Sequence, residues 1–185
     1  MFRKPTLLAC AIVCCGFVAA SATAQEVSTP AVEIGLNYSW LHVNSSNYDY
    51  HRTGNGGSGY VEYNLNSSFG LVADIGGYAN TRTGIGDTAM TYLFGPRFNF
   101  RRSRFTPYVQ ALFGGVSAWT PTPGTQNAFA MAAGGGLDFQ VSNHIAVKPI
   151  QAEYVMTRLP NALGFGSHQN DIRYSAGVVF RIGSK

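Results

Sequence analysis

Histidine and serine are the residue types in this sequence that could carry out hydrolysis. That chemistry needs a serine, a histidine and a carboxylate close together. His42 follows Ser39 by three residues, and His168 precedes Asp171 by three residues, so a site built on either histidine is an alternative that stays open. The sequence has no HExxH pattern, no phosphate-binding loop and no paired cysteines for a metal. We therefore predict that the chain is not an enzyme and needs no metal and no cofactor.

The first residues have the pattern of an export signal. A positively charged start precedes the apolar run Leu7 to Ala20, which is too short for a transmembrane helix, and Ala22-Thr23-Ala24 is a small-x-small cleavage site. We predict a cleaved signal peptide over residues 1–24 and a single domain over residues 25–185. All three cysteines lie in the signal, so we expect no disulfide in the domain.

The composition is unusual for a soluble domain. Charged residues make up 12% of the chain, about half the usual share, while aromatic residues reach 13% and there are 22 glycines. The formal net charge is only +4, and no basic stripe supports binding of nucleic acid. Few charges, many aromatics and much glycine are typical of a transmembrane β-barrel.

Alternation of apolar and polar residues with a period of two recurs along the chain and predicts strands. In the seventh strand the alternation slips, and a β-bulge at Pro149 would restore one apolar face. The fold class that we predict is all-β, an eight-stranded antiparallel up-and-down transmembrane β-barrel. The expected strands are Ala31–Val43, Gly57–Leu65, Phe69–Tyr78, Ala89–Phe100, Phe105–Ser117, Ala128–Val141, Ile145–Thr157 and Asp171–Ile182.

The two faces of these strands differ in charge. One face is apolar with essentially no charge, so we expect it to contact lipid rather than water. The other face would line the lumen, which in an eight-stranded barrel is just wide enough to be filled by side chains. We interpret its charged residues as an ion-pair network, with ion conduction or gating as the alternative. They are Glu33, Glu62, Asp74, Arg97, Asp138, Lys148, Glu153, Arg173 and Arg181.

The connections alternate in length, as in an outer-membrane barrel with short periplasmic turns and long external loops. The tight turns are expected at residues 66–68, 101–104 and 142–144, and the long loops at residues 44–56, 79–88, 118–127 and 158–170. In the first loop, we predict that Tyr48, Tyr50, His51 and Arg52 contact a surface ligand.

The last strand carries a more specific pattern. Ser175, Gly177, Phe180 and Ile182 follow the order polar, glycine, aromatic, hydrophobic. This pattern resembles the terminal-strand signal that the barrel-assembly machinery reads when it inserts outer-membrane barrels.

Four segments carry a resemblance to a known family. They are GLVADIGGY (Gly70 to Tyr78), TYLFGPRFNF (Thr91 to Phe100), TPYVQALFGG (Thr106 to Gly115) and IQAEYVMTR (Ile150 to Arg158). With them, the chain resembles the OmpA-like/opacity-type outer-membrane β-barrel superfamily, and within it the short, barrel-only members of acidobacterial type. The resemblance implies an eight-stranded barrel with surface loops, but no single function.

These observations lead to one main hypothesis and two alternatives. The main hypothesis is an outer-membrane protein, exported by its signal peptide, with a structural or surface-interaction role through its external loops. Its expected partners are outer-membrane lipid and lipopolysaccharide, the barrel-assembly machinery and an unidentified external surface ligand, but not nucleic acid. The alternatives are a narrow channel or gated pore, and a lipid A-modifying or hydrolytic enzyme at the outer rim.

Overall fold

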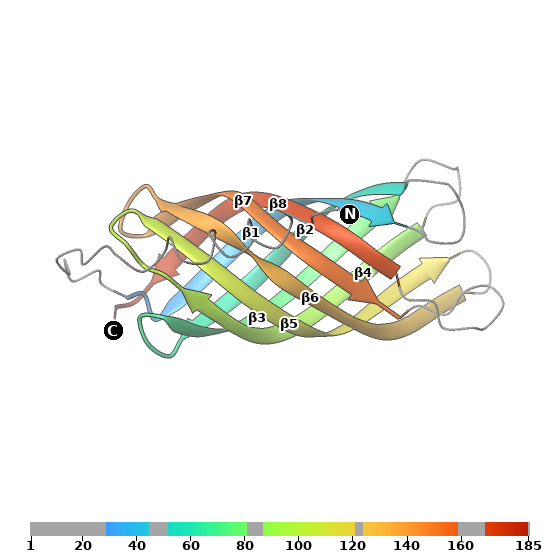
Figure 1. Cartoon of the computed structure of the whole chain (residues 1–185), viewed down its shortest axis with the longest axis horizontal. Coiled ribbons are helices and arrows are strands. Elements are labelled where there is room, and N and C mark those ends of the chain that lie inside the picture. The colour runs from blue at the N-terminus through green and yellow to red at the C-terminus, as the bar shows by residue number, and fades with distance from the viewer. Residues whose placement is uncertain (1–28, 45–51, 81–86, 121–123, 159–168, 185) are drawn as a thin grey trace, which may run out of the picture.

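The computed structural model describes residues 29–44, 52–80, 87–120, 124–158 and 169–184. These residues form a closed barrel of eight antiparallel strands, which confirms the predicted fold class (Figure 1). Among them, no helix is long and apolar enough to cross a membrane. The strands are β1 (Val32–Asn44), β2 (Arg52–Asn64), β3 (Phe69–Asn80), β4 (Asp87–Asn99), β5 (Phe105–Thr120), β6 (Gly124–Gln140), β7 (Ile145–Thr157) and β8 (Gln169–Ile182).

Each strand pairs with its neighbour in sequence, and pairing of β1 with β8 closes the barrel. The closing register begins at Val32 opposite Ile182 and runs to Asn44 opposite Asn170. The end of β8 therefore lies beside the start of β1, at the end of the barrel that also holds the three tight turns (left in Figure 1). We call this the turn end and the opposite one the loop end.

Alternation along each strand separates a buried inner face from an exposed outer face. Strand β7 shows one interruption, where Pro149 and Ile150 are both exposed between the buried Lys148 and Gln151. The register with β8 shifts at the same place, between Lys148 and Gln151. The predicted bulge at Pro149 is confirmed, and it keeps the polar residues of β7 on the inner face.

The outer face is apolar over most of its area. Leu36, Phe94 and Phe113 are about half exposed although they are large and hydrophobic. Near the loop end, Trp40 stacks on Tyr174 with 6.0 Å between ring centroids. Near the turn end, Phe105 packs against Phe139 at 5.1 Å. Such a surface is stable where it is covered by lipid.

Three strands extend furthest beyond their predicted limits at the loop end. Strand β2 begins at Arg52 instead of Gly57, and β5 and β6 extend to Thr120 and Gly124. The first loop is therefore shorter than expected, and the third, predicted over residues 118–127, is reduced to residues 121–123 outside the strands. Glycine and polar residues favour loops in the sequence pattern, but such local preferences are weak where cross-strand pairing decides the structure.

At the turn end, three strands end earlier than the sequence pattern predicts. Leu65, Phe100 and Val141, predicted as the last residues of their strands, lie in the turns. The loop-end boundaries of β3, β4 and β8 differ from the prediction by about two residues.

Candidate functional site

The lumen is filled by polar side chains from all eight strands. All nine charged residues assigned to it from the sequence point inward, and none is more than 6% exposed. Two further charged residues lie there: Asp171 is 4% exposed, and the side chain of Arg101 is also 4% exposed. Burying so many charges is unfavourable unless each is paired or hydrogen-bonded.

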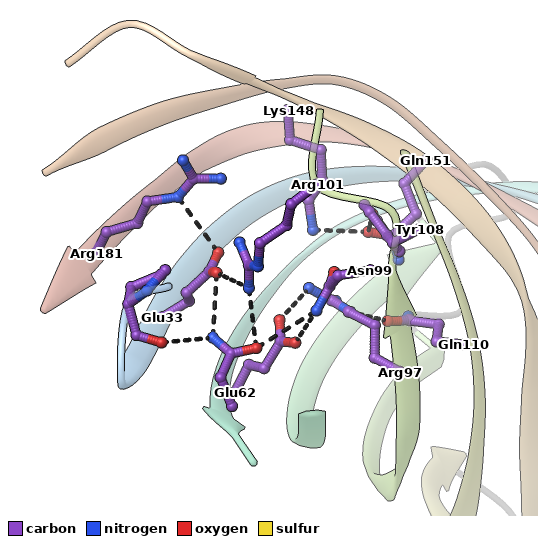
Figure 2. Close-up of polar contacts among 12 residues, drawn as sticks. Glu33, Glu62, Arg97, Asn99, Arg101, Tyr108, Gln110, Lys148, Gln151 and Arg181 are labelled. Atoms are coloured by element: carbon purple, nitrogen blue, oxygen red, sulfur yellow. Dashed lines mark hydrogen bonds and ion pairs between the residues drawn. The ribbon is translucent and has the colours of Figure 1, made fainter. Parts of the chain in front are cut away.

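Glu33 is the centre of the contacts nearest the turn end. Arg101 Nη2 donates to Glu33 Oε1 at 2.6 Å, and Arg181 Nε lies 3.6 Å from Glu33 Oε2 (Figure 2). Asn64 bridges the same groups, because its Nδ2 donates to Glu33 and its Oδ1 accepts from Arg101 at 2.9 Å. Arg101 also donates from Nε to the Ser67 carbonyl, which ties the β4–β5 turn to the β2–β3 turn.

The next contacts along the lumen centre on Arg97. Its Nη1 donates to Glu62 Oε2 at 2.8 Å, and its Nε donates to Gln110 Oε1 at 2.8 Å. Asn99 Nδ2 donates to the second oxygen of Glu62 at 2.6 Å and lies 3.4 Å from Asn64 Oδ1. Asn99 therefore joins the Arg97 contacts to those of Glu33, as Figure 2 shows.

A third group of contacts centres on Glu153. Gln110 Nε2 donates to Glu153 Oε1 at 2.7 Å, so Gln110 joins Arg97 to this group. Arg173 pairs with the other oxygen of Glu153 at 2.6 Å and reaches Asp74 at 3.5 Å. Arg173 Nη1 also donates to the Tyr78 hydroxyl at 2.5 Å.

Two tyrosine rings and two cations cross the middle of the lumen. The Arg97 guanidinium lies 4.6 Å from the Tyr60 ring centroid and 4.3 Å from that of Tyr108. Lys148 Nζ lies 4.1 Å and 5.1 Å from the same two rings. Gln151 Oε1 accepts from both Lys148 Nζ, at 2.9 Å, and the Tyr108 hydroxyl, at 2.7 Å. Cation–π contacts at these distances are favourable, and more so in a desolvated site.

A glycine makes room for one of these rings. Gly35 of β1 pairs with Tyr60 of β2, and a Cβ at position 35 would overlap the Tyr60 ring. The absence of a side chain on β1 thus lets the ring lie against the wall and leaves the lumen to the cations.

These contacts form one continuous structure, which we call the lumen column. Nearer the loop end, neutral pairs continue it: Ser39 and Ser175 are 2.8 Å apart, and Asn37 lies 3.4 Å from Ser58. No group of three or more metal-ligating residues occurs in the described part of the chain. The members linked by hydrogen bonds and ion pairs are Arg181, Glu33, Arg101, Asn64, Asn99, Glu62, Arg97, Gln110, Glu153, Arg173, Asp74, Tyr78, Gln151, Lys148 and Tyr108.

The other residues singled out in the sequence do not join the column as a group. Tyr48, Tyr50 and His51 lie outside the described residues, and Arg52 is the first residue of β2 rather than part of a loop. Of the terminal-strand pattern, Ser175 contacts Ser39 in the lumen, whereas Phe180 and Ile182 are exposed on the outer face.

The serine–histidine site considered near the rim is not formed by His42 and Ser39. Ser39 is buried in the lumen, while His42 lies on the outer face beside Trp40, with 5.8 Å between ring centroids. An odd sequence separation in a strand puts two side chains on opposite faces, so Ser39 cannot reach His42 through the barrel wall. His168 lies outside the described residues.

Comparison with known proteins gives one family match and several similar folds. The family model for an outer membrane protein beta-barrel domain matches residues 10–180. The structure of Neisserial surface protein A is similar with a TM-score of 0.67 and 15% identity, covering 82% of this chain and 97% of that one.

Two other solved structures share the fold. Ail, the attachment invasion locus protein of Yersinia pestis, gives a TM-score of 0.57 at 15% identity, covering 83% of this chain and 99% of its own. OprG from Pseudomonas aeruginosa gives a TM-score of 0.52 at 10% identity, covering 85% of this chain and 98% of its own. No curated protein matches the chain significantly by sequence.

Proposed function

This chain belongs to the family of outer membrane protein β-barrel domains, and on that premise we propose that it acts as a surface-interaction protein with a closed lumen. Membership of this family implies location in the outer membrane. The export signal over residues 1–24 is part of the proposal, as is an orientation with the turn end in the periplasm.

The lumen column is the observation that carries the proposal. A barrel can act through its lumen or through the surface that it presents outside the membrane. Here Arg97, Glu62 and Gln110 are joined across the lumen by bonds of 2.8 Å, and Tyr60 and Tyr108 occupy the space beside them. Side chains that fill the lumen leave the loop end as the place where a ligand can be bound.

Similar barrels support a role at the cell surface. One of them is named a surface protein, and Ail is named an attachment invasion locus protein. Ail has also been crystallised with the heparin analogue sucrose octasulfate, at 17% identity and a TM-score of 0.56. We therefore choose a sulfated polysaccharide as the first external ligand to test.

The test replaces the connection between β1 and β2, residues 45–51, with a glycine–serine linker of equal length. Cells that display the protein are measured for adhesion to heparin-coated surfaces, with the same replacement of residues 81–86 as the matched control. We expect adhesion to be lost in the first variant and retained in the second. Adhesion equal to that of the unaltered protein in both variants would remove the first connection from the proposal.

The terminal-strand pattern and the expected lack of catalysis belong to the same proposal. Phe180 and Ile182 lie on the outer face of β8, where an insertion machinery can reach them. Replacing Phe180 with Ser should reduce the amount of barrel in the outer membrane, whereas replacing Val178 with Ser on the same face should not. Lipid A from producing cells should be unchanged by mass spectrometry, and a new lipid A species would overturn the non-enzymatic assignment.

A narrow channel is the second candidate, because the lumen is polar rather than apolar. Asp138 Oδ1 and the Tyr60 hydroxyl are buried without a hydrogen-bond partner, so water could enter beside them. Conductance in planar bilayers should be absent for a closed barrel. Openings that increase in Glu62→Gln or Arg97→Gln would favour the channel and contradict the closed lumen.

A further inference from the structure

The turn between β4 and β5 is held in place by hydrogen bonds on both of its strands. The ladder continues beyond the strands, because Phe100 N donates to the Pro107 carbonyl at 2.8 Å. Arg102 and Phe105 then exchange two backbone hydrogen bonds of 2.9 Å each. Ser103, with a φ of 49°, occupies the left-handed region and reverses the chain. The turn is therefore a regular extension of the β4–β5 hairpin.

Neighbouring elements fix the turn from both sides. The Arg104 carbonyl accepts from Gln140 N of β6 at 2.8 Å. On the other side, the Arg101 side chain enters the lumen and bonds Glu33 and the Ser67 carbonyl. A backbone fixed in this way presents its outward side chains in defined positions, so less entropy is lost when a ligand binds.

Arg102 and Arg104 are the exposed basic side chains of this turn. Both are exposed, and neither guanidinium has a hydrogen bond or ion pair within the described ranges. Phe100 and Phe105 flank them and are 56% and 51% exposed. Two free guanidinium groups next to two exposed aromatic rings form what we call the basic turn, which consists of Phe100, Arg102, Arg104 and Phe105.

No acidic side chain opposes the basic turn in the part of the chain that the structure describes. The other segments at the turn end, residues 65–68, 141–144 and 183–184, contain no Asp or Glu. All acidic side chains with a described environment are buried in the lumen. They are Glu33, Glu62, Asp74, Asp138, Glu153 and Asp171. Among the described residues, the outer surface of the turn end is therefore positively charged.

Alternation along β4 sets the level of Arg102 relative to the membrane. Phe98, Phe100 and Arg102 share outward parity, and the two phenylalanines are about half exposed. Aromatic side chains of outer-membrane barrels gather at the boundary between lipid and water. Because the strand is tilted, the two residues from Phe100 to Arg102 advance the chain by roughly 5 Å along the membrane normal. This places Arg102 at the level of the lipid phosphates.

We propose that the basic turn binds the phosphate of an anionic phospholipid in the periplasmic leaflet, with the acyl chains against Phe100 and Phe105. Guanidinium groups bind phosphate through two parallel N–H···O bonds, which suits a headgroup phosphodiester. A lipid with net negative charge is favoured over a zwitterionic one, because no described residue at this surface has an acidic side chain that could receive an amine. The proposal rests on the proposed function only in its choice of the periplasmic leaflet. Binding of the phosphate by the basic turn does not depend on which way the barrel is oriented in the membrane.

The test uses the protein purified from outer membranes of cells that express the full chain. It is placed in nanodiscs of phosphatidylethanolamine containing a small fraction of phosphatidylglycerol or cardiolipin, and bound lipid is measured by native mass spectrometry. We expect affinity for the anionic lipid to fall roughly fivefold for Arg102→Gln or Arg104→Gln and roughly 30-fold for the double variant. The affinity of the unaltered protein should also fall as salt is raised.

Arg158 provides a matched control, because it is an exposed arginine at the loop end. Arg158→Gln should leave anionic lipid binding unchanged. Heat-modifiable migration on gels shows whether each variant has folded, and Arg102→Lys/Arg104→Lys, which keeps the charge, should retain part of the affinity. Equal binding by the folded double variant, or an equal loss in Arg158→Gln, would overturn the proposal. The proposal would also be overturned if the double variant lost binding to soluble peptidoglycan fragments but kept its affinity for the anionic lipid.

The orientation of the barrel in the membrane is measured separately, so that a wrong orientation can be distinguished from a lack of lipid binding. Ser103→Cys should not react with a membrane-impermeant maleimide in intact cells if the turn end is periplasmic. Labelling of this cysteine in intact cells would contradict the proposed orientation and move the site to the outer leaflet, while lipid binding in nanodiscs would still stand on its own result.

Discussion

Arg101 and Arg102 are neighbours in the chain, yet they belong to two regions with opposite physical character. Arg101 enters the lumen column, where its side chain is 4% exposed and bonded to Glu33 and Asn64. Arg102 belongs to the basic turn and is exposed. One step along a β-ladder turns a side chain from one face to the other. The same residue type therefore stabilises the barrel at one position and is available to bind a ligand at the next.

Among substitutions in the two regions, the largest loss of stability is expected at Arg97. Arg97→Ala leaves Glu62 buried without its cation, and breaking one member of a buried pair destabilises a protein by about 3–5 kcal/mol. Urea unfolding in lipid vesicles, followed by the fluorescence of Trp40 and Trp119, measures the free energy of unfolding. A loss below 1 kcal/mol would mean that water already screens this pair.

Arg101 should give a smaller loss, because it lies at the mouth of the lumen. Arg101→Gln keeps one amide but removes the charge that faces Glu33, and hydrogen bonds to charged groups contribute about 1.5–3 kcal/mol. The same urea titration measures this loss. If stability is unchanged, Arg181 is sufficient as the partner of Glu33 and Arg101 belongs functionally to the basic turn.

The neutral part of the column should tolerate substitution better than the charged part. Ser39→Ala removes the 2.8 Å hydrogen bond to Ser175, and a neutral hydrogen bond contributes about 0.5–1.5 kcal/mol. The unfolding midpoint in urea should shift correspondingly little. A loss as large as that of Arg97→Ala would show that the charged and neutral parts of the column are coupled.

Arg102 should show no measurable loss of stability. Its side chain makes no contact in the lumen, and exposed substitutions away from special features change stability little. Arg102→Gln is therefore expected to unfold at the same urea concentration as the unaltered protein while binding less anionic lipid. A clear destabilisation would show that Arg102 has a structural partner and would weaken the contrast with Arg101.

The sequence predicts the inner face well because alternation is a local signal. Glu33, Arg97 and Arg173 can each be assigned to it from their immediate neighbours, and the bulge at Pro149 from a slip in parity. Arg101 is missed, because it lies in a segment read as a tight turn, although the hairpin ladder continues through it. Continued parity from Asn99 to Arg101 is the signal that could have found it.

Strand ends at the loop end are predicted less well for a related reason. The segment Gly54 to Gly57 has the composition of a loop, yet it pairs with β1 and β3. Its pairing depends on strands that are distant in sequence and cannot be seen in the segment itself. The boundary of a strand is therefore decided by its partners more than by its own residues.

The sequence alone determined which residues face the lumen and which face outward, since a period of two requires only the residues of one strand. Only the tertiary structure decided which charges meet. Glu33 contacts Arg101, which is 68 residues away, because barrel closure and register place the start of β1 within reach of the Arg101 side chain through the lumen. Pairing between distant strands depends on the stagger of the whole barrel, and a shift of one residue in a single strand would replace every cross-strand partner of that strand.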